Sequence, residues 1–246
     1  MQWHEAEYIG QKIESATTRR FWFKIKSEQA LPYAAGQFFT FDLPMGQKRA
    51  ERWRSYSVAN AWDGSNMIEL CISYKKGGLA SRYFFEDINK GDVLKFKGPD
   101  GGFILPSNVG STLNMICTGA GIVPFRSMIQ EVEKNGMKHE GIHLIFGVRK
   151  VKDILYYEEI VDWAKYLKNF KASICLSRET KLPPNAENLT FHNGYVHPVY
   201  LNEKYRALKE NIFMICGWTE IIDETVLHLI NELKVDRGQI KYELFG

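Results

Sequence analysis

Two short segments of this 246-residue chain carry residues that suit cofactor chemistry. The first is Arg54-Ser55-Tyr56-Ser57. Its arginine can bind a phosphate through a forked pair of hydrogen bonds. Tyr56 offers a flat ring for stacking and a hydroxyl, and Ser57 is a small donor and acceptor beside a reactive ring. The segment therefore suits a flavin, and the alternative is an ordinary strand with alternating exposure.

The second segment is Thr118-Gly119-Ala120-Gly121-Ile122-Val123-Pro124, which separates an apolar strand from a helix. Two glycines let the backbone approach a phosphate, and the helix N-terminus adds free N–H groups and the positive end of a dipole. The pattern Gly-x-Gly-x-x-Pro differs from the standard dinucleotide fingerprint, so a plain tight turn is the alternative. A flavin site followed by a dinucleotide site predicts hydride transfer.

Three further positions could bind phosphate. Gly77-Gly78-Leu79-Ala80-Ser81 places glycines before a predicted helix, although a structural hairpin turn would read the same way. Ser177-Arg178 and Arg149 follow two apolar strands, and ligands of open α/β sheets bind at the carboxyl ends of strands. An arginine there can bind a 2′-phosphate, but each arginine alone also fits a solvated surface charge.

A zinc-protease pattern, His139-Glu140-Gly141-Ile142-His143, is present but unsuitable. That chemistry needs both histidines on one helix face, whereas Gly141 interrupts a helix and Ile142 begins a predicted strand. We therefore predict no metal site. The four cysteines are far apart and lie in apolar runs, which fits neither a disulfide framework nor an iron–sulfur cluster and favours a reducing cytoplasm.

Bulk properties exclude several classes of function. The chain is 45% apolar and 25% charged, and its net charge of +3 is too small to argue for a nucleic-acid partner. Residues 1–7 lack the features of a signal peptide. No apolar stretch is long enough to span a bilayer. We expect a cytoplasmic protein without a membrane span.

The segments before residue 105 predict an antiparallel β-barrel. They are short, alternating and rich in β-branched and aromatic residues. We expect strands at residues 21–25, 37–41, 68–72 and 93–96, and one helix at about residues 80–87.

After residue 110, apolar strands alternate with amphipathic helices, which predicts a buried parallel sheet. We expect strands at residues 113–117, 142–148, 172–176, 212–216 and 240–245. The helices are expected at residues 124–133, 156–167, 202–209 and 220–233. The fold class is thus an N-terminal antiparallel β-barrel (residues 1–105) plus a C-terminal doubly wound α/β domain with a parallel sheet (residues 106–246).

Eight motifs in order resemble the ferredoxin–NADP reductase family of flavoproteins over nearly the whole chain. They are Arg54-x-Tyr56-Ser57, Gly78-x-x-Ser81, Gly98-Pro99-x-Gly101-x-Phe103, Thr118-Gly119-x-Gly121-x-x-Pro124, Phe146-Gly147-Val148-Arg149, Ser177-Arg178-Glu179, Cys216-Gly217 and Glu243-Leu244-Phe245-Gly246.

The resemblance implies an FAD-binding domain in the first half. FAD contacts are implied for Arg54, Ser55, Tyr56, Ser57, Cys71, Ile72, Ser73, Gly78, Leu79, Ala80, Ser81 and Phe245. Arg54 and Ser81 would hold the phosphates. Tyr56 would stack on the isoalloxazine ring, and Ser57 would lie near its N5 atom. Phe245 would shield the flavin until nicotinamide displaces it.

The resemblance also implies an NADPH site in the second half. Coenzyme contacts are implied for Thr118, Gly119, Gly121, Arg149, Ser177, Arg178 and Gly217. Cys216 would lie beside the nicotinamide, and Glu243 would place the nicotinamide or take part in proton traffic. With Ser57, these two residues form the predicted catalytic set.

Three departures from the family pattern stand out. Trp218 and Ile221 replace a small residue or proline and a methionine after Cys216-Gly217, so the nicotinamide pocket is expected to differ in shape. Gly246 follows Phe245, and Ser73 stands where some plant-type relatives have lysine.

The predicted function is hydride transfer between NADPH and FAD and single-electron transfer between FAD and ferredoxin or flavodoxin. Lys75, Lys76 and Arg82 form a possible basic rim for an acidic carrier, or are simply solvated loop charges. Two alternatives are a non-catalytic electron-relay or redox-sensing subunit and an NADH-dependent reductase component of an oxygenase. FMN in place of FAD, the direction of electron flow and the oligomeric state are left open, with a monomer favoured.

Overall fold

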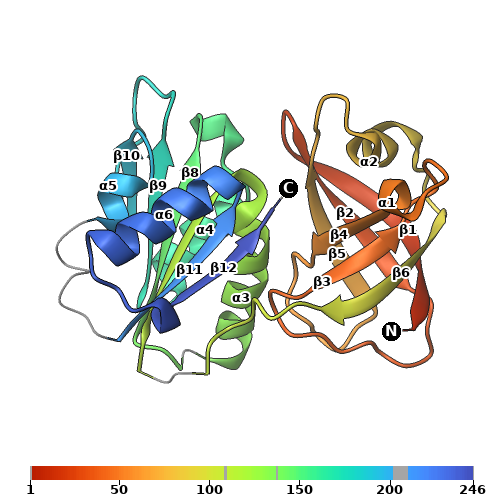
Figure 1. Ribbon diagram of the computed structural model, residues 1–246, viewed down its shortest axis with the longest axis horizontal. Helices are drawn as coiled ribbons and strands as arrows, with labels where there is room; N and C mark the ends of the chain where they lie inside the picture. Colours follow the sequence, from red (N-terminus) through yellow and green to blue (C-terminus); the bar gives the residue numbers. More distant parts are fainter. Residues whose placement is uncertain (1, 108–109, 137, 202–209, 246) are drawn as a thin grey trace. The chain divides into compact units, whose positions relative to one another are not determined.

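The computed structural model describes residues 2–107, 110–136, 138–201 and 210–245, whose strands form two six-stranded sheets (Figure 1). The chain divides into two compact units. One contains Met1–Leu105 and Val123–Glu131, and the other contains Pro106–Ile122 and Val132–Gly246. No helix among the described residues is long and apolar enough to cross a bilayer.

The first sheet is antiparallel throughout, with the order β4-β3-β6-β1-β2-β5. Its strands are β1 Trp3–Ser15, β2 Thr18–Ile25, β3 Phe38–Asp42, β4 Trp53–Ser57, β5 Met67–Ser73 and β6 Val93–Asp100. Alternate residues of β2 and β3 point inward, and Phe21, Phe23, Phe39 and Phe41 are fully buried. This period-two burial forms one aromatic core, and the predicted antiparallel barrel is confirmed.

Short helices complete this unit. Helix α1 is Arg49–Arg52, and the predicted helix at residues 80–87 consists of α2 (Leu79–Arg82) followed by a π-helical turn, η1 (Tyr83–Asp87). The wider turn of η1 accompanies the burial of two consecutive aromatic residues, Tyr83 and Phe84, against the core.

The second sheet is parallel throughout, with the order β10-β9-β8-β7-β11-β12. Its strands are β7 Thr112–Thr118, β8 Gly141–Val148, β9 Phe170–Leu176, β10 Leu189–Asn193, β11 Asn211–Gly217 and β12 Ile240–Leu244. The helices are α3 Ile122–Asn135, α4 Tyr157–Tyr166, α5 His197–Tyr200 and α6 Thr219–Asn231, with a 3₁₀ turn, η2, at Gly119–Gly121. The predicted α/β domain is confirmed. The predicted helix at residues 202–209 lies outside the described residues.

Helix α3 follows β7 in the chain, but residues 123–131 pack within the barrel unit. The buried guanidinium of Arg126 donates to the carbonyl oxygen of Ala59 over 2.6 Å and contacts the carboxylate of Glu69 at 3.3 Å. The hydroxyl of Ser127 accepts from the backbone N–H of Gly36 over 3.0 Å. These contacts fix this part of α3 to the loops and strands of the barrel.

Candidate cofactor sites

The segment Arg54–Ser57 lies in the edge strand β4, as the strand interpretation predicts, and this strand is paired with β3 on one side only, so the flavin interpretation stays a prediction. The guanidinium of Arg54 donates to the carbonyl oxygens of Ala50 (2.8 Å) and Trp53 (2.7 Å). The ring of Tyr56 meets Phe84 edge-on, with centroids 5.4 Å apart, and its burial raises the pKa of its hydroxyl. Ser57 is buried and Ser55 is exposed.

The barrel is open between β4 and β5, which lie at opposite ends of the sheet order. The two edges meet where the N–H of Ala59 donates to the carbonyl oxygen of Glu69 over 2.8 Å. Beyond this point, residues 54–57 and 71–73 are not paired with each other in the sheet. A ligand that lies between the two edges could therefore bind backbone groups of either strand.

The residues Cys71, Ile72 and Ser73 form the end of β5. Cys71 and Ile72 are buried and Ser73 is exposed, and the hydroxyl of Ser73 lies 2.9 Å from that of Thr18 on β2. The structure thus places two predicted FAD-binding segments on the two edges of one opening.

The glycine turn after β5 is the predicted phosphate-binding segment. Gly78 directly precedes α2, and the hydroxyl of Ser81 accepts from the N–H of Lys75 over 3.0 Å. A Cβ at Gly78 would lie 3.0 Å from both the Lys75 carbonyl oxygen and the Ser81 hydroxyl. The side chain of Ser81 therefore shapes the turn, and the first N–H groups of α2 are the ones that a phosphate can bind.

The carboxyl ends of the parallel strands bring the second set together. Cys216 of β11 pairs in register with Cys117 of β7 and with Glu243 of β12. The N–H of Phe245 continues this pairing to the carbonyl oxygen of Gly217 over 2.8 Å. The predicted catalytic residues Cys216 and Glu243 are therefore neighbours at the carboxyl end of the sheet. The predicted cofactor-binding residues Gly217 and Phe245 lie beside them.

The two glycines of the turn Gly119–Gly121 have different surroundings. A Cβ at Gly121 would lie 2.3 Å from the carbonyl oxygen of Cys216, whereas at Gly119, with a φ of +53°, it would meet nothing within 4 Å. Gly121 thus allows η2 to pack closely on β11. Gly119 is the glycine beside open space, where a phosphate can approach.

The thiol of Cys216 is fully buried. Its burial raises the pKa well above the ordinary value, and the nearby charges of Glu243 and Cys117 act in the same direction. The thiol is therefore protonated at neutral pH, and its predicted role is contact with the nicotinamide rather than attack by a thiolate.

Two arginines are held side by side by backbone hydrogen bonds. The N–H of Arg178 donates to the carbonyl oxygen of Arg149 over 2.8 Å, and the N–H of Ser177 donates to that of Val148 over 3.0 Å. Both arginines are exposed. Their joint placement beyond β8 and β9 suits a phosphate monoester better than either arginine alone.

The strand expected at the zinc-protease pattern is confirmed. His143 lies in β8 with its Nε2 2.9 Å from the Ser173 hydroxyl, and its burial lowers its pKa to about 3. His139 precedes the strand, with its Nε2 3.0 Å from the carbonyl oxygen of Pro106. The two histidines therefore do not share a helix face, and the described residues contain no group of three or more metal-ligating side chains.

A buried ionic cluster escaped the sequence analysis. Arg20 binds both carboxylate oxygens of Glu69, at 2.6 and 2.9 Å, and Arg126 contacts the second oxygen. The available signal was an acidic residue within the apolar run of residues 68–72. Its partners are far apart in the chain, so the sequence could not identify them.

Comparison with known proteins agrees with this geometry. Residues 6–104 match the oxidoreductase FAD-binding domain, and residues 115–226 match the oxidoreductase NAD-binding domain. The chain is 27% identical to a ferredoxin–NADP reductase B of Sorangium cellulosum, covering 98% of this chain and 97% of that protein. It is 25% identical to the reductase component of propane 2-monooxygenase from Rhodococcus jostii, covering 87% of this chain but only 55% of that longer protein.

A solved structure supports the fold over the full length. The ferredoxin NADP⁺ reductase of Neisseria gonorrhoeae, with bound FAD and NADP, superposes with a TM-score of 0.79 at 22% identity, covering 99% of both chains. The two cofactor domains occur in this order, and their motif residues gather at the opening between β4 and β5 and at the carboxyl end of the parallel sheet. Together these features identify the class of enzyme. The chain belongs to the ferredoxin–NADP reductase family and is an NAD(P)H oxidoreductase that transfers electrons through FAD.

Proposed function

We propose that this protein oxidises NADPH and passes electrons singly to a small carrier protein such as ferredoxin or flavodoxin. The opening between β4 and β5 carries this proposal, because two strand edges that are not paired with each other in the sheet flank it and the predicted phosphate-binding turn follows β5. In this proposal residues 1–105 bind FAD and residues 106–246 bind the coenzyme in a cytoplasmic protein.

Each half of the chain has side chains and backbone N–H groups that could bind its cofactor. When both are bound, the cofactors supply hydride transfer from nicotinamide to flavin and release of electrons one at a time. Arg54 and the first N–H groups of α2 would hold the FAD phosphates, and Tyr56 would stack on the ring. Ser57 would offer its hydroxyl near the reactive part of the ring. In the second unit, Gly119 would admit the coenzyme pyrophosphate, and Glu243 would place the nicotinamide or take part in proton traffic.

Purified protein is expected to be yellow and to bleach when NADPH is added without oxygen. The reason is that the residues at the β4–β5 opening would hold a flavin, which supplies hydride chemistry when both cofactors are bound. Absorbance in an anaerobic stopped-flow instrument measures this directly. Protein that takes up neither FAD nor FMN after reconstitution would contradict the proposal.

Two variants separate chemistry from cofactor binding. Ser57→Ala and Glu243→Gln should each slow flavin reduction by about tenfold, because each variant loses one hydrogen bond to a reacting group. The flavin content of both variants should stay near that of the wild type. An unchanged reduction rate in both variants would remove these two residues from the proposed set.

The preference for NADPH rests on the paired arginines. Arg178→Ala should raise the KM for NADPH by roughly 10- to 100-fold, because a charge-assisted hydrogen bond contributes about 1.5–3 kcal/mol. The KM for NADH should change little, since that coenzyme lacks the 2′-phosphate. Steady-state kinetics with both coenzymes provide the measurement, and equal effects on the two would contradict the assignment.

A second candidate function is the NADH-dependent reductase of an oxygenase, since the Rhodococcus jostii relative is the reductase component of propane 2-monooxygenase. A third is an electron-relay subunit without turnover of its own. An anaerobic assay of NADPH and NADH against a panel of ferredoxins and flavodoxins distinguishes the three. The predicted basic rim is partly offset in this structure, because Arg82 lies 3.9 Å from the carboxylate of Asp87.

A further inference from the structure

The main chain of Glu69 closes the barrel at one end of the opening between β4 and β5. Its carbonyl oxygen accepts from the N–H of Ala59 over 2.8 Å, and its N–H donates to the side-chain oxygen of Asn60 over 2.8 Å. Ala59 and Asn60 follow β4 in the chain, whereas Glu69 lies in β5. The two edges of the opening are therefore joined at this one residue of β5.

Two of the predicted flavin-contacting residues lie close to this closure. Ser57 is two residues before Ala59, and Cys71 is two residues after Glu69. Both side chains are buried. Two residues of a strand span about 7 Å. A change in the closure therefore changes the distance between Ser57 on one edge and Cys71 on the other.

One nitrogen atom of Arg126 contacts both sides of the closure. Its Nη1 donates to the carbonyl oxygen of Ala59 over 2.6 Å and lies 3.3 Å from a carboxylate oxygen of Glu69. The side chains of Arg126 and Glu69 are each 5% exposed. At such burial a charged hydrogen bond is stronger than in water. Arg126 thus ties the segment after β4 to β5 through a second, side-chain link.

The helix that carries Arg126 is itself fixed to the barrel. Further along α3, the side-chain oxygen of Gln130 accepts from the N–H of Ala61 over 3.1 Å. The carboxylate of Glu131 accepts from the N–H of Ala35 over 3.2 Å. Residues four apart are neighbours on a helix surface, so Gln130 lies beside Arg126. The guanidinium therefore extends from a fixed stretch of helix.

The carboxylate of Glu69 is also held from the side opposite the helix. Arg20 on β2 donates to both of its oxygens, over 2.6 and 2.9 Å. Arg20 is paired in register with Cys71, so this contact lies beside the predicted flavin residue. With Arg20 in place, the carboxylate stays turned toward Arg126.

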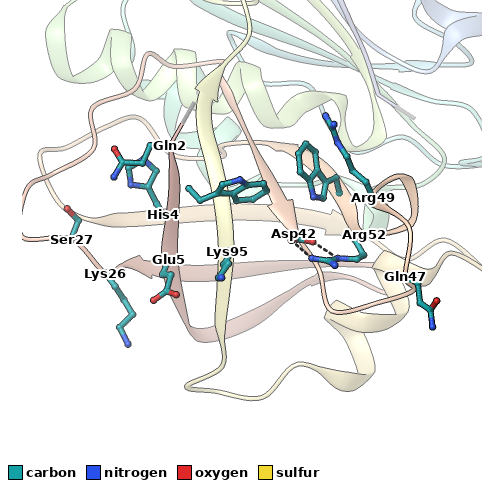
Figure 2. Close-up of a pocket in the computed structure, with 12 residues that line it drawn as sticks. Gln2, His4, Glu5, Lys26, Ser27, Asp42, Gln47, Arg49, Arg52 and Lys95 are labelled. Carbon is teal, nitrogen blue, oxygen red and sulfur yellow. Dashed lines mark hydrogen bonds and ion pairs between the residues drawn. The ribbon is translucent and has the colours of Figure 1, made fainter.

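Another arginine–carboxylate pair of the barrel has a different setting. Figure 2 shows Arg52 beside Asp42 in a hollow on the outer face. Arg52 donates to both oxygens of Asp42, one over 2.8 Å, and its side chain is 41% exposed. This pair joins α1 to β3, so both of its ends lie on the β4 side of the opening. It provides a comparison in which the same charge is removed away from the closure.

We propose that Arg126 is a positioning residue for the flavin, because it fixes the separation of the two strand edges that carry Ser57 and Cys71. The inference rests on the proposed function, in which a flavin binds at this opening. Arg126 acts through Ala59 and Glu69 and does not touch the reacting atoms. Such a role has large effects, since a misplacement of about 1 Å at a reacting centre can cost on the order of 100-fold in rate.

The first test measures flavin binding by the full-length protein after removal of its flavin. Arg126→Met removes the bridging nitrogen and keeps a long side chain. We expect calorimetric titration with FAD to give a Kd raised by about tenfold, because the site is less preorganised. The visible circular dichroism of the bound flavin should also change, since the flat ring acquires this signal only from the asymmetry of its site.

A rescue variant and two controls separate positioning from general destabilisation. Arg126→Lys should bring the Kd to within about threefold of the wild type, because one ammonium can donate to both oxygens that Nη1 contacts. Arg52→Met removes the same charge from the exposed pair, and Ser127→Ala removes another contact between α3 and the barrel. Both controls should keep the Kd within about twofold of the wild type, with unchanged dichroism.

A double-mutant cycle with Ser57 tests the mechanism. Arg126→Met alone should slow flavin reduction by NADPH about tenfold. If Arg126 acts by placing the Ser57 hydroxyl, adding Arg126→Met to Ser57→Ala should slow reduction by less than about threefold more. Two independent tenfold effects would instead multiply to about 100-fold, and that result would overturn the inference.

The outcomes distinguish this inference from the proposed function. A wild-type protein that binds no flavin would overturn both. If the wild type binds FAD, an unchanged Kd and dichroism in Arg126→Met would overturn the inference alone, as would equal changes in Ser127→Ala. Thermal unfolding shows whether each variant is folded, and Arg126→Gln replaces Arg126→Met in every measurement if that variant is not.

Discussion

Replacing Glu69 with alanine should lower the free energy of unfolding by about 3–5 kcal/mol, the usual cost of removing one partner from a buried ion pair. The side chains of Glu69 and Arg126 are each only 5% exposed. The carboxylate is bound on both oxygens by Arg20 and on one by Arg126. Its removal leaves a guanidinium from α3 and one from β2 without their common partner.

Chemical denaturation followed by circular dichroism measures this loss. Arg126→Met is the matched comparison, because it leaves Glu69 bound to Arg20 and should therefore cost less than Glu69→Ala. The double variant Glu69→Leu/Arg20→Met/Arg126→Met removes every charge of the cluster and should recover much of the stability. A loss below about 1 kcal/mol for Glu69→Ala would show that the cluster is not a stabilising contact.

Gly121→Ala should destabilise the parallel-sheet unit by about 3 kcal/mol, at the upper end of the range for overpacking. The added Cβ would lie 2.3 Å from the carbonyl oxygen of Cys216 and 2.8 Å from its carbonyl carbon. These are backbone atoms of a central strand, which cannot rotate away as a side chain can. The turn must therefore move off β11, and we expect weaker coenzyme binding as well.

Gly119→Asn is the control for this substitution. The site has open space, and its φ of +53° suits asparagine, which tolerates the left-handed region better than other residues. We expect a cost of about 1 kcal/mol or less in thermal unfolding. A Gly121→Ala protein as stable as Gly119→Asn would contradict the packing role assigned to Gly121.

The sequence predicted the two sheets because their burial patterns differ. The alternation in residues 21–25 corresponds to a sheet with one buried face, and the continuous apolar run in residues 212–216 corresponds to a strand covered on both faces. Strand β10 was missed because its five residues, Leu189–Asn193, include Thr190, His192 and Asn193. An edge strand with polar residues has no clear periodicity.

The cofactor segments could be found in sequence, but their arrangement could not. Arg54–Ser57 and Cys71–Ser73 lie on strands at opposite ends of the sheet order, and only closure of the sheet at Ala59 and Glu69 brings those edges together. Gly121 was predicted to contact phosphate, and the structure shows a further constraint on it, the close packing against β11, nearly a hundred residues later in the chain. Contacts between residues so far apart in the chain cannot be predicted from the spacing of residues within a short segment.

The four buried cysteines give each of the two sheets at least one site for chemical labelling. Cys71 lies in β5, whereas Cys117, Cys175 and Cys216 lie in β7, β9 and β11. Burial raises the pKa of the latter three, that of Cys175 to about 12, and alkylating reagents attack only the thiolate. A cysteine can therefore be alkylated only after local opening of the sheet exposes its strand. Mass spectrometry after different labelling times then measures how often each sheet opens, with the protein's own cysteines as probes.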